Sequence, residues 1–185
     1  MKKIAILASG NGSNAEEIIK HFSGSSKAKV ITIASNKKEA YVLERAKKHE
    51  IPFFFFTKSQ MDEGILERTF KQLGIDLVVL AGFLLKIPDG LIRQFPERII
   101  NIHPALLPKF GGKGMYGMRV HEAVKEKGEK ETGITIHYVN EKYDDGRVIF
   151  QESVKVEETD SPEDIANKVH ALEYKYFPKV IESLL

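Results

Sequence analysis

An amide and an imidazole stand two positions apart at Asn101 and His103, and this pair of side chains suits acyl chemistry. The amide can donate a hydrogen bond to a developing oxyanion, and the imidazole can move a proton near pH 7. Pro104 favours extended backbone at the residue before it, and extended backbone puts alternate side chains on one face. We therefore expect both groups to face one site; the alternative is that His103 only packs or hydrogen-bonds a loop.

A carboxylate that could serve this imidazole is Asp144, which lies in a polar stretch at residues 140–147. A carboxylate beside an imidazole fixes its tautomer and raises its pKa by favouring the charged form. The segment 144–146, Asp-Asp-Gly, is equally suited to an ordinary turn. The residues alone leave Asp144 open between a turn and a partner of His103.

A glycine-rich segment, Ser-Gly-Asn-Gly-Ser-Asn at residues 9–14, follows the first apolar run and opens the first helical stretch. Glycines let backbone N–H groups approach an oxyanion, and a helix N-terminus favours negative charge, so we expect a phosphate there. A loop that binds nothing is the alternative. A whole dinucleotide fits poorly, because the third glycine of the fingerprint is missing and residues 35–37 hold no acid for a ribose.

Other reactive groups are few. The chain has no cysteine, which excludes disulfides, thiolate metal sites and cysteine nucleophiles. His121 lacks a second histidine four residues later, where Lys125 stands, so there is no zincin motif and we expect no metal. The remaining histidines that we interpret as structural are His21, His49 and His137.

The elements that must position these groups alternate along the first half of the chain. Short apolar runs predict buried strands at residues 4–8, 30–34, 52–56, 77–81 and 99–102. Helical patterns fall between them at residues 14–22, 38–49, 61–73 and 88–95. This alternation predicts an α/β fold with a doubly wound, mostly parallel sheet.

The second half has a different pattern. Two strand-like runs at residues 133–139 and 148–156 are joined by a short polar connection, which indicates antiparallel neighbours or a hairpin. Ser161 and Pro162 mark the start of a helix that we expect to run to about Leu184. No linker or repeat divides the chain, so we expect one domain over residues 1–185.

Composition excludes several classes of protein. The chain has 185 residues, 42% of them apolar and 29% charged, with a net charge of +2. No basic block of five or more residues occurs, which disfavours a nucleic-acid partner. The first apolar run stops at Gly10, too early for a signal peptide or a membrane span. We therefore expect a cytoplasmic protein with no membrane partner.

Taken together, these segments resemble the folate-dependent formyltransferases, and in particular the branch that acts on glycinamide ribonucleotide. The matching segments run nearly end to end, at residues 9–14, 35–37, 80–83, 101–108, 133–139 and 143–146. The sequence Asn-Ile-His-Pro-Ala-Leu-Leu-Pro at residues 101–108 and the later aspartate are specific to the family. The segment at residues 9–14 narrows the resemblance to that branch.

The resemblance implies a role for each of several residues. The implied catalytic residues are Asn101, His103 and Asp144. The implied substrate-binding residues are Gly12, Ser13, Asn14, His170, Ala171, Leu172 and Glu173, with Glu173 the expected direct ligand. The implied folate-binding residues are Leu84, Leu85, Lys86, Ile87, Asn101, Asn140, Glu141, Lys142, Tyr143 and Asp144.

The resemblance also implies an activity. The family transfers a formyl group directly from 10-formyltetrahydrofolate, as co-substrate, to the amine of the phosphoribosyl glycinamide in purine biosynthesis, without a metal. The expected partners are therefore these small molecules. The segment 110–118 is longer and richer in glycine than the usual family loop, so a formyltransferase of another amine, such as a sugar nucleotide, is an alternative.

Other members of the family fit less well. A transfer-RNA-directed enzyme would need a further C-terminal domain and a basic surface, and a formyltetrahydrofolate hydrolase an extra N-terminal domain. Outside the enzymes, the rival is a non-catalytic module that binds a phosphorylated metabolite. That rival predicts ligand binding that is insensitive to His103.

Overall fold

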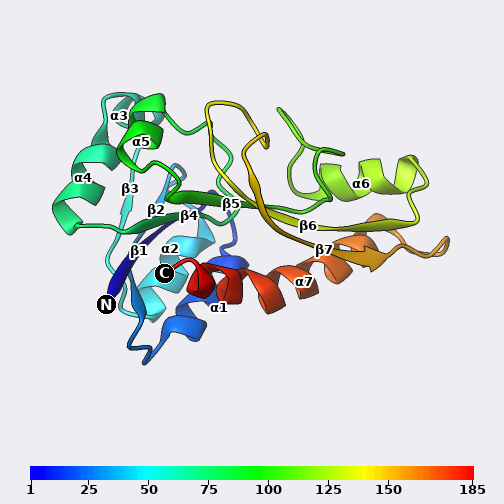
Figure 1. Ribbon diagram of the computed structural model, residues 1–185, viewed down its shortest axis with the longest axis horizontal. Helices are drawn as coiled ribbons and strands as arrows, with labels where there is room; N and C mark the ends of the chain where they lie inside the picture. Colours follow the sequence, from blue (N-terminus) through cyan, green and yellow to red (C-terminus); the bar gives the residue numbers. More distant parts are fainter.

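Seven strands form one sheet in the order β3-β2-β1-β4-β5-β6-β7 (Figure 1). The computed structural model describes residues 1–185, and its strands are β1 (Lys2–Leu7), β2 (Ala28–Ser35), β3 (Phe53–Phe55), β4 (Leu77–Leu80), β5 (Ile99–His103), β6 (Glu131–Tyr138) and β7 (Val148–Lys155). The first five strands are parallel, whereas β6 is antiparallel to β5 and β7 to β6. The predicted mostly parallel sheet with an antiparallel C-terminal part is confirmed.

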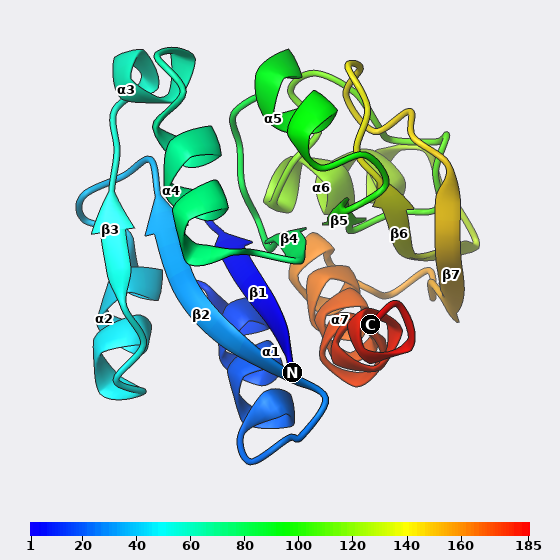
Figure 2. The same ribbon diagram turned by 60° about the vertical axis from the view of Figure 1, so that its left-hand side comes forward.

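Helices cover both faces of this sheet. They are α1 (Ser13–Phe22), α2 (Tyr41–Lys48), α3 (Lys58–Asp62), α4 (Ile65–Leu73), α5 (Asp89–Gln94), α6 (Met118–Glu126) and α7 (Pro162–Ser183). Figures 1 and 2 show α1, α2 and α7 on one face and α3, α4 and α5 on the other. Helix α6 packs against α7 beyond the parallel part of the sheet. No helix has the length and apolar character needed to cross a membrane.

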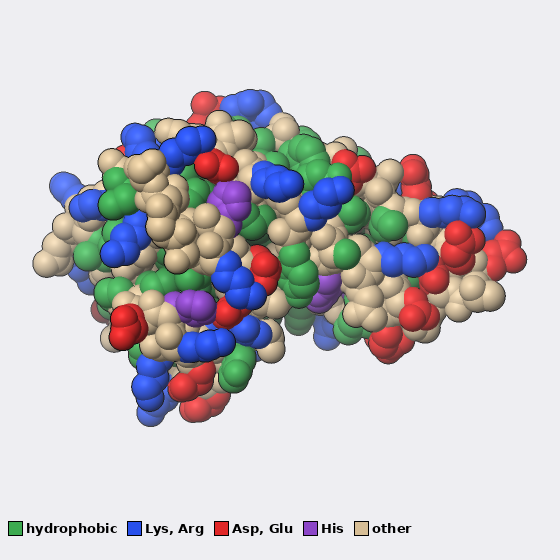
Figure 3. All heavy atoms as spheres, turned by 90° about the horizontal axis from the view of Figure 1, so that it is seen from below, with side chains coloured by type: hydrophobic (Ala, Val, Ile, Leu, Met, Phe, Trp, Pro, Cys, Tyr) green, Lys and Arg blue, Asp and Glu red, His purple; other side chains and the backbone are tan.

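The strands form because their apolar side chains are buried on both faces. In β1, Ile4 and Ile6 join the apolar cluster beneath α1, α2 and α7, while Ala5 and Leu7 join the cluster beneath α3, α4 and α5. This alternation follows from the two-residue period of a strand. On the outer surface, basic and acidic side chains are interspersed over the face that Figure 3 shows.

One predicted helix is wrong and one helix was not predicted. Residues 61–73 are not one helix, because Gly64 has a φ of 80° and separates α3 from α4. In the capping box of α3, the Thr57 hydroxyl accepts a hydrogen bond from the Gln60 N–H at 3.2 Å. The helix therefore begins at Lys58, before the start at residue 61 that the apolar pattern predicts. Helix α6 was not predicted, because it begins within a glycine-rich segment.

The phenylalanine-rich strand is less buried than predicted. Phe56 is fully buried, but Phe53 and Phe55 are 44% and 40% exposed. The reason is that β3 is an edge strand, so the side chains of one of its faces meet solvent.

The strand order creates the place where a ligand can bind. After β1 the chain crosses to β2 on one side, whereas after β4 it crosses to β5 on the other side. The loops that leave the carboxyl ends of β1 and β4 therefore diverge and leave a crevice between them. Asn101 and His103 lie at the carboxyl end of the neighbouring strand β5, as predicted.

Candidate active site

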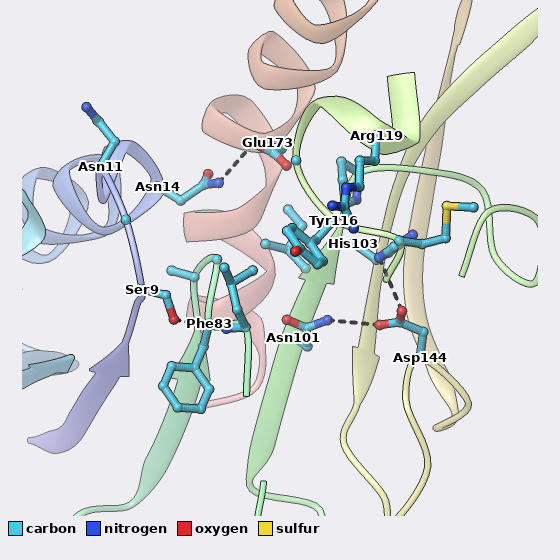
Figure 4. Close-up of a pocket in the computed structure, with 18 of the residues that line it drawn as sticks. Ser9, Asn11, Asn14, Phe83, Asn101, His103, Tyr116, Arg119, Asp144 and Glu173 are labelled. Atoms are coloured by element: carbon cyan, nitrogen blue, oxygen red, sulfur yellow. Dashed lines mark hydrogen bonds and ion pairs between the residues drawn. The ribbon is translucent and has the colours of Figure 1, made fainter. Parts of the chain in front are cut away.

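A cavity of about 670 Å³ occupies this crevice, at the carboxyl ends of β1, β4 and β5 (Figure 4). Its other walls are the segment 112–117 and parts of α6 and α7. The cavity is lined by ten of the residues singled out from the sequence: Gly12, Ser13, Asn14, Leu84, Asn101, His103, Tyr143, Asp144, His170 and Glu173.

The glycine-rich loop ends at the N-terminus of α1. Gly12 has a φ of 74° and caps the helix without a side-chain hydrogen bond. A Cβ at this position would lie 2.9 Å from the Cα of Val42, so only glycine fits here. The first N–H groups of α1 thus have no side-chain cap, which is the arrangement that binds anions at helix N-termini.

Ser9 joins the loops that meet at the crevice. Its N–H donates to the Gly82 carbonyl at 2.9 Å, and its hydroxyl donates to Asn36 Oδ1 at 2.6 Å. The same hydroxyl accepts from the Leu84 N–H at 3.0 Å. These bonds fix the loops after β1, β2 and β4 relative to one another.

His103 is held between two acceptors. Its Nε2–H donates to the Phe110 carbonyl at 2.7 Å, and its Nδ1 lies 3.5 Å from Asp144 Oδ2. Burial lowers the pKa of this imidazole below its ordinary value, although the charge of Asp144 and the Phe110 carbonyl act in the opposite direction. The expected effect of Asp144 on the ring is present, but desolvation outweighs it in the free protein.

Asp144 receives contacts from three elements. The Gly112 N–H donates to its Oδ2 at 2.9 Å, and the Asn101 amide donates to its Oδ1 at 3.5 Å. Burial favours the neutral carboxyl, but hydrogen bonding from His137, the charge of His103 and the Gly112 N–H together lower the pKa of Asp144. Asp144 is therefore ionised at neutral pH. Its backbone has a φ of 51°, so the turn that the sequence indicated also presents the carboxylate.

His137, interpreted above as structural, is buried in contact with the same cluster. The register of β5 and β6 places it directly beside Asn101. Its Nδ1–H donates to the Tyr138 carbonyl at 2.9 Å, and its Nε2 lies 3.1 Å from the Asn101 amide nitrogen and 3.6 Å from Asp144 Oδ1. Figure 4 shows the amide nitrogen of Asn101 on the side of Asp144 and the amide oxygen on the opposite side.

At the other end of the cavity, Asn14 joins α1 to α7. Its Nδ2 donates to Glu173 Oε2 at 2.9 Å, while its Oδ1 is buried without a partner. Glu173 is 6% exposed, and burial raises the pKa of its carboxyl despite the hydrogen bond from Asn14. An unpaired buried oxygen and a buried carboxyl are groups that a polar ligand would satisfy.

Further residues line the cavity that the sequence did not indicate. His121 is 1% exposed and its Nδ1 has no partner. Burial, together with the neighbouring charges of His170 and His103, lowers the pKa of His121 to about 4. No local sequence pattern places His121 at the cavity; the position of α6 in the fold does. Exposed cations that line the cavity are Lys37, Lys113 and Arg119, and the Arg119 guanidinium carbon lies 5.2 Å from the centroid of the Tyr116 ring.

Eight residues implied by the resemblance lie outside the cavity lining: Leu85, Lys86, Ile87, Asn140, Glu141, Lys142, Ala171 and Leu172. Leu172 packs against the core and Ala171 is exposed on α7. Lys86 is exposed, 3.9 Å from Asp89, and Ile87 is buried. The loops that carry these residues adjoin the cavity through Leu84 and Tyr143.

This fold and this site have known counterparts. Residues 2–181 match the formyl transferase family, and the chain belongs to that family. Four curated relatives at 38–43% identity are named phosphoribosylglycinamide formyltransferase. The Bacillus subtilis enzyme of that name is 38% identical over 192 residues, covering 100% of this chain and 95% of the relative.

Other relatives carry the same name. The chloroplastic enzyme of Arabidopsis thaliana is 43% identical over 190 residues, which cover 99% of this chain. The chain spans 65% of that relative and 61% of the Vigna unguiculata relative. The crystal structure of the Bacillus halodurans enzyme superposes with a TM-score of 0.89 at 37% identity, covering 100% of this chain and 95% of that one.

Proposed function

We propose that the protein transfers a formyl group from 10-formyltetrahydrofolate to the amine of phosphoribosyl glycinamide, giving the N-formyl product, a step of de novo purine biosynthesis. The observation that carries this proposal is that an uncapped helix N-terminus and the Asn101, His103 and Asp144 side chains line one cavity. The names of the relatives support the same transferred group and the same acceptor.

The phosphate end of the acceptor binds at Gly12, Ser13 and Asn14, where N–H groups at the start of α1 face the cavity. The buried carboxyl of Glu173 and the unpaired Oδ1 of Asn14 take the sugar hydroxyl groups. His170 lines the same end. This placement directs the amine of the acceptor along the cavity toward His103.

The formyl donor binds at the other end, next to Leu84, Asn101 and Tyr143. The segments 84–87 and 140–144 hold it, and we expect contacts through the backbone, since many of their side chains point elsewhere. Apolar Phe83 and Leu84 suit a flat ring system, and polar groups nearby can orient it. The donor supplies an activated formyl carbon.

The transfer forms a bond between the amine nitrogen and the formyl carbon and breaks the bond from that carbon to the donor nitrogen. Asn101 donates a hydrogen bond to the formyl oxygen, which becomes negative during the transfer. The hydrogen that it uses is the one now directed at Asp144, because that hydrogen bond, at 3.5 Å, is at the limit of hydrogen bonding. A good donor here contributes roughly 3–4 kcal/mol. His103 helps to move a proton from the amine to the departing nitrogen, while Asp144 holds the ring.

No metal is part of this proposal, because the steps need only hydrogen bonds and proton transfer. We further propose that residues 1–185 form one domain and that the partners are small molecules rather than nucleic acid or membrane. We also propose a cytoplasmic location.

The test is an assay of the purified protein with glycinamide ribonucleotide and 10-formyl-5,8-dideazafolate, followed by the absorbance change of deformylation. We expect turnover that requires the amine. Turnover without amine would indicate a hydrolase, and turnover only with an amino-sugar nucleotide would assign another acceptor. Either result would contradict the proposal.

A further inference from the structure

Helix α2 holds the glycine-rich loop from outside the cavity. The Arg45 guanidinium donates through Nε to the Asn11 carbonyl at 2.8 Å and through Nη2 to Asn11 Oδ1 at 2.7 Å. On the same helix, the Val42 N–H donates to the Gly10 carbonyl at 3.1 Å. Two consecutive loop residues are therefore fixed by α2 immediately before Gly12.

Arg45 does not itself line the cavity. Figure 4 shows the Asn11 side chain directed away from the cavity, on the outer side of the loop. The two bonds from Arg45 fix both the main chain and the side chain of Asn11, and this geometry uses the forked donors of a guanidinium. Any effect of Arg45 on a bound ligand must therefore pass through the loop.

The same guanidinium also contacts an anion beneath the loop. Glu16, in the first turn of α1, is 6% exposed; its Oε2 accepts from Arg45 Nη1 at 3.2 Å, and its Oε1 lies 2.8 Å from His49 Nε2. Burial would raise the pKa of this carboxyl, but the hydrogen bonds from His49 and Arg45 lower it. The carboxylate is ionised one turn from the N–H groups that face the cavity.

An uncompensated carboxylate at that position would repel a phosphate at the helix N-terminus. Solvent and salt screen the repulsion between buried charges only weakly. Arg45 offsets this charge and at the same time holds Asn11. We propose that Arg45 is a positioning residue for the substrate phosphate, acting through Asn11 and by pairing with Glu16. This inference rests on the proposed function, since it takes the phosphate of the acceptor as the ligand of the loop.

The first test compares KM and kcat of Arg45→Met with those of the wild type. We expect KM for the phosphorylated acceptor to rise about 10-fold to 100-fold, the loss typical of charge-assisted hydrogen bonds, with kcat and the KM of the formyl donor changed less than about 2-fold. With the glycinamide riboside, which lacks the phosphate, kcat/KM should be nearly equal for the two proteins. An equal loss with both acceptors would overturn the inference.

Lys48→Met is the matched control. Lys48 lies on the same helix, is exposed, and its side chain makes no hydrogen bond or ion pair, so the substitution removes the same charge without touching the loop. We expect wild-type kinetics from it. Arg45→Lys keeps a cation beside Glu16 but cannot donate in two directions to Asn11, so it should fold like the wild type and still raise KM several-fold.

Binding of inorganic phosphate, measured by titration calorimetry, tests the inference without turnover. We expect phosphate to bind the wild-type protein and Lys48→Met alike, and to bind both Arg45 variants at least several-fold more weakly. Equal affinity in all four proteins, or no phosphate binding by the wild type, would overturn the role of Arg45. Failure of the wild type to formylate the acceptor would overturn the proposed function, and the titration would still decide the role of Arg45.

Discussion

The Phe110 carbonyl holds the Nε2 hydrogen of His103, so Nδ1, beside Asp144, is the position where this ring can gain or lose a proton. Asp144 also connects His103 to Asn101, whose amide lies beside His137. Four polar groups from β5, β6 and the loop after β6 thus form one contact network. In this arrangement the carboxylate orients the imidazole and the amide together.

Substitutions in this network should affect the chemical step. We expect His103→Ala and Asp144→Asn each to lower kcat by at least about 100-fold, the range typical of general acid–base groups. His21→Ala is the control, because His21 contacts Glu182 on α7 and lies outside the cavity lining. Steady-state kinetics of the three variants provide the measurement. Near-wild-type turnover of His103→Ala would refute the mechanism.

His121 should make stability depend on pH. Its pKa is about 4 in the folded protein against an ordinary value of 6.5, so the unfolded chain binds the proton more readily between these values. The free energy of unfolding should therefore be highest above pH 6.5 and should fall as the pH decreases toward 4, by about 3 kcal/mol from this group.

Urea unfolding of the wild type and His121→Gln at a series of pH values measures this contribution. The difference between the two curves should change with pH in that window and be constant above it. Parallel curves would show that His121 does not titrate as an isolated buried imidazole.

Some of the site could be predicted from residues and some could not. Asn101 and His103 were placed on one face by the two-residue period of an extended chain. The link to Asp144 depends on a left-handed backbone at that residue and on the strand register, which no local pattern shows. His121 reaches the cavity only because α6 packs against α7.

At the scale of elements, the β1–α1 connection has the strictest geometric requirement. Gly12→Ala would force a side chain into a left-handed conformation and against Val42. We expect it to lower the free energy of unfolding by about 1–3 kcal/mol and to raise KM for the phosphorylated acceptor. Gly10→Ala is the matched control, since a Cβ there meets no atom within 4 Å.

Urea unfolding and steady-state kinetics of the two alanine variants test this prediction. Equal behaviour of the variants would mean that the loop rearranges freely and that its conformation does not set phosphate affinity.

The strands and most helices were predictable, because their apolar residues follow the periods of buried strands and amphipathic helices. The start of α7 was also predictable, since Ser161 and Asp164 form a capping box. The break at Gly64 and the start of α6 were not, because both depend on how glycine-containing turns are packed by the rest of the molecule.

At the scale of the whole molecule, the strand order decides where the chemistry takes place. The loop after β1 and the polar residues of β5 are separated by about ninety residues in the chain (Gly12 and Asn101), yet β4 alone lies between their strands. The antiparallel pair β6 and β7 extends the sheet past β5 and supplies His137 and the loop with Asp144. Helix α7 supplies Glu173, which accepts a hydrogen bond from Asn14 of α1 at the other end of the cavity.

The central claim is that this cavity joins a formyl carbon directly to the amine of a phosphoribosyl glycinamide. The most direct test supplies a donor with ¹³C in the formyl group and an acceptor with ¹⁵N in the amine, and follows the reaction by NMR. We predict a one-bond ¹³C–¹⁵N coupling in the product with the wild-type protein, strongly slowed in His103→Ala. Label that accumulates in formate, or stays in the donor, would contradict the claim.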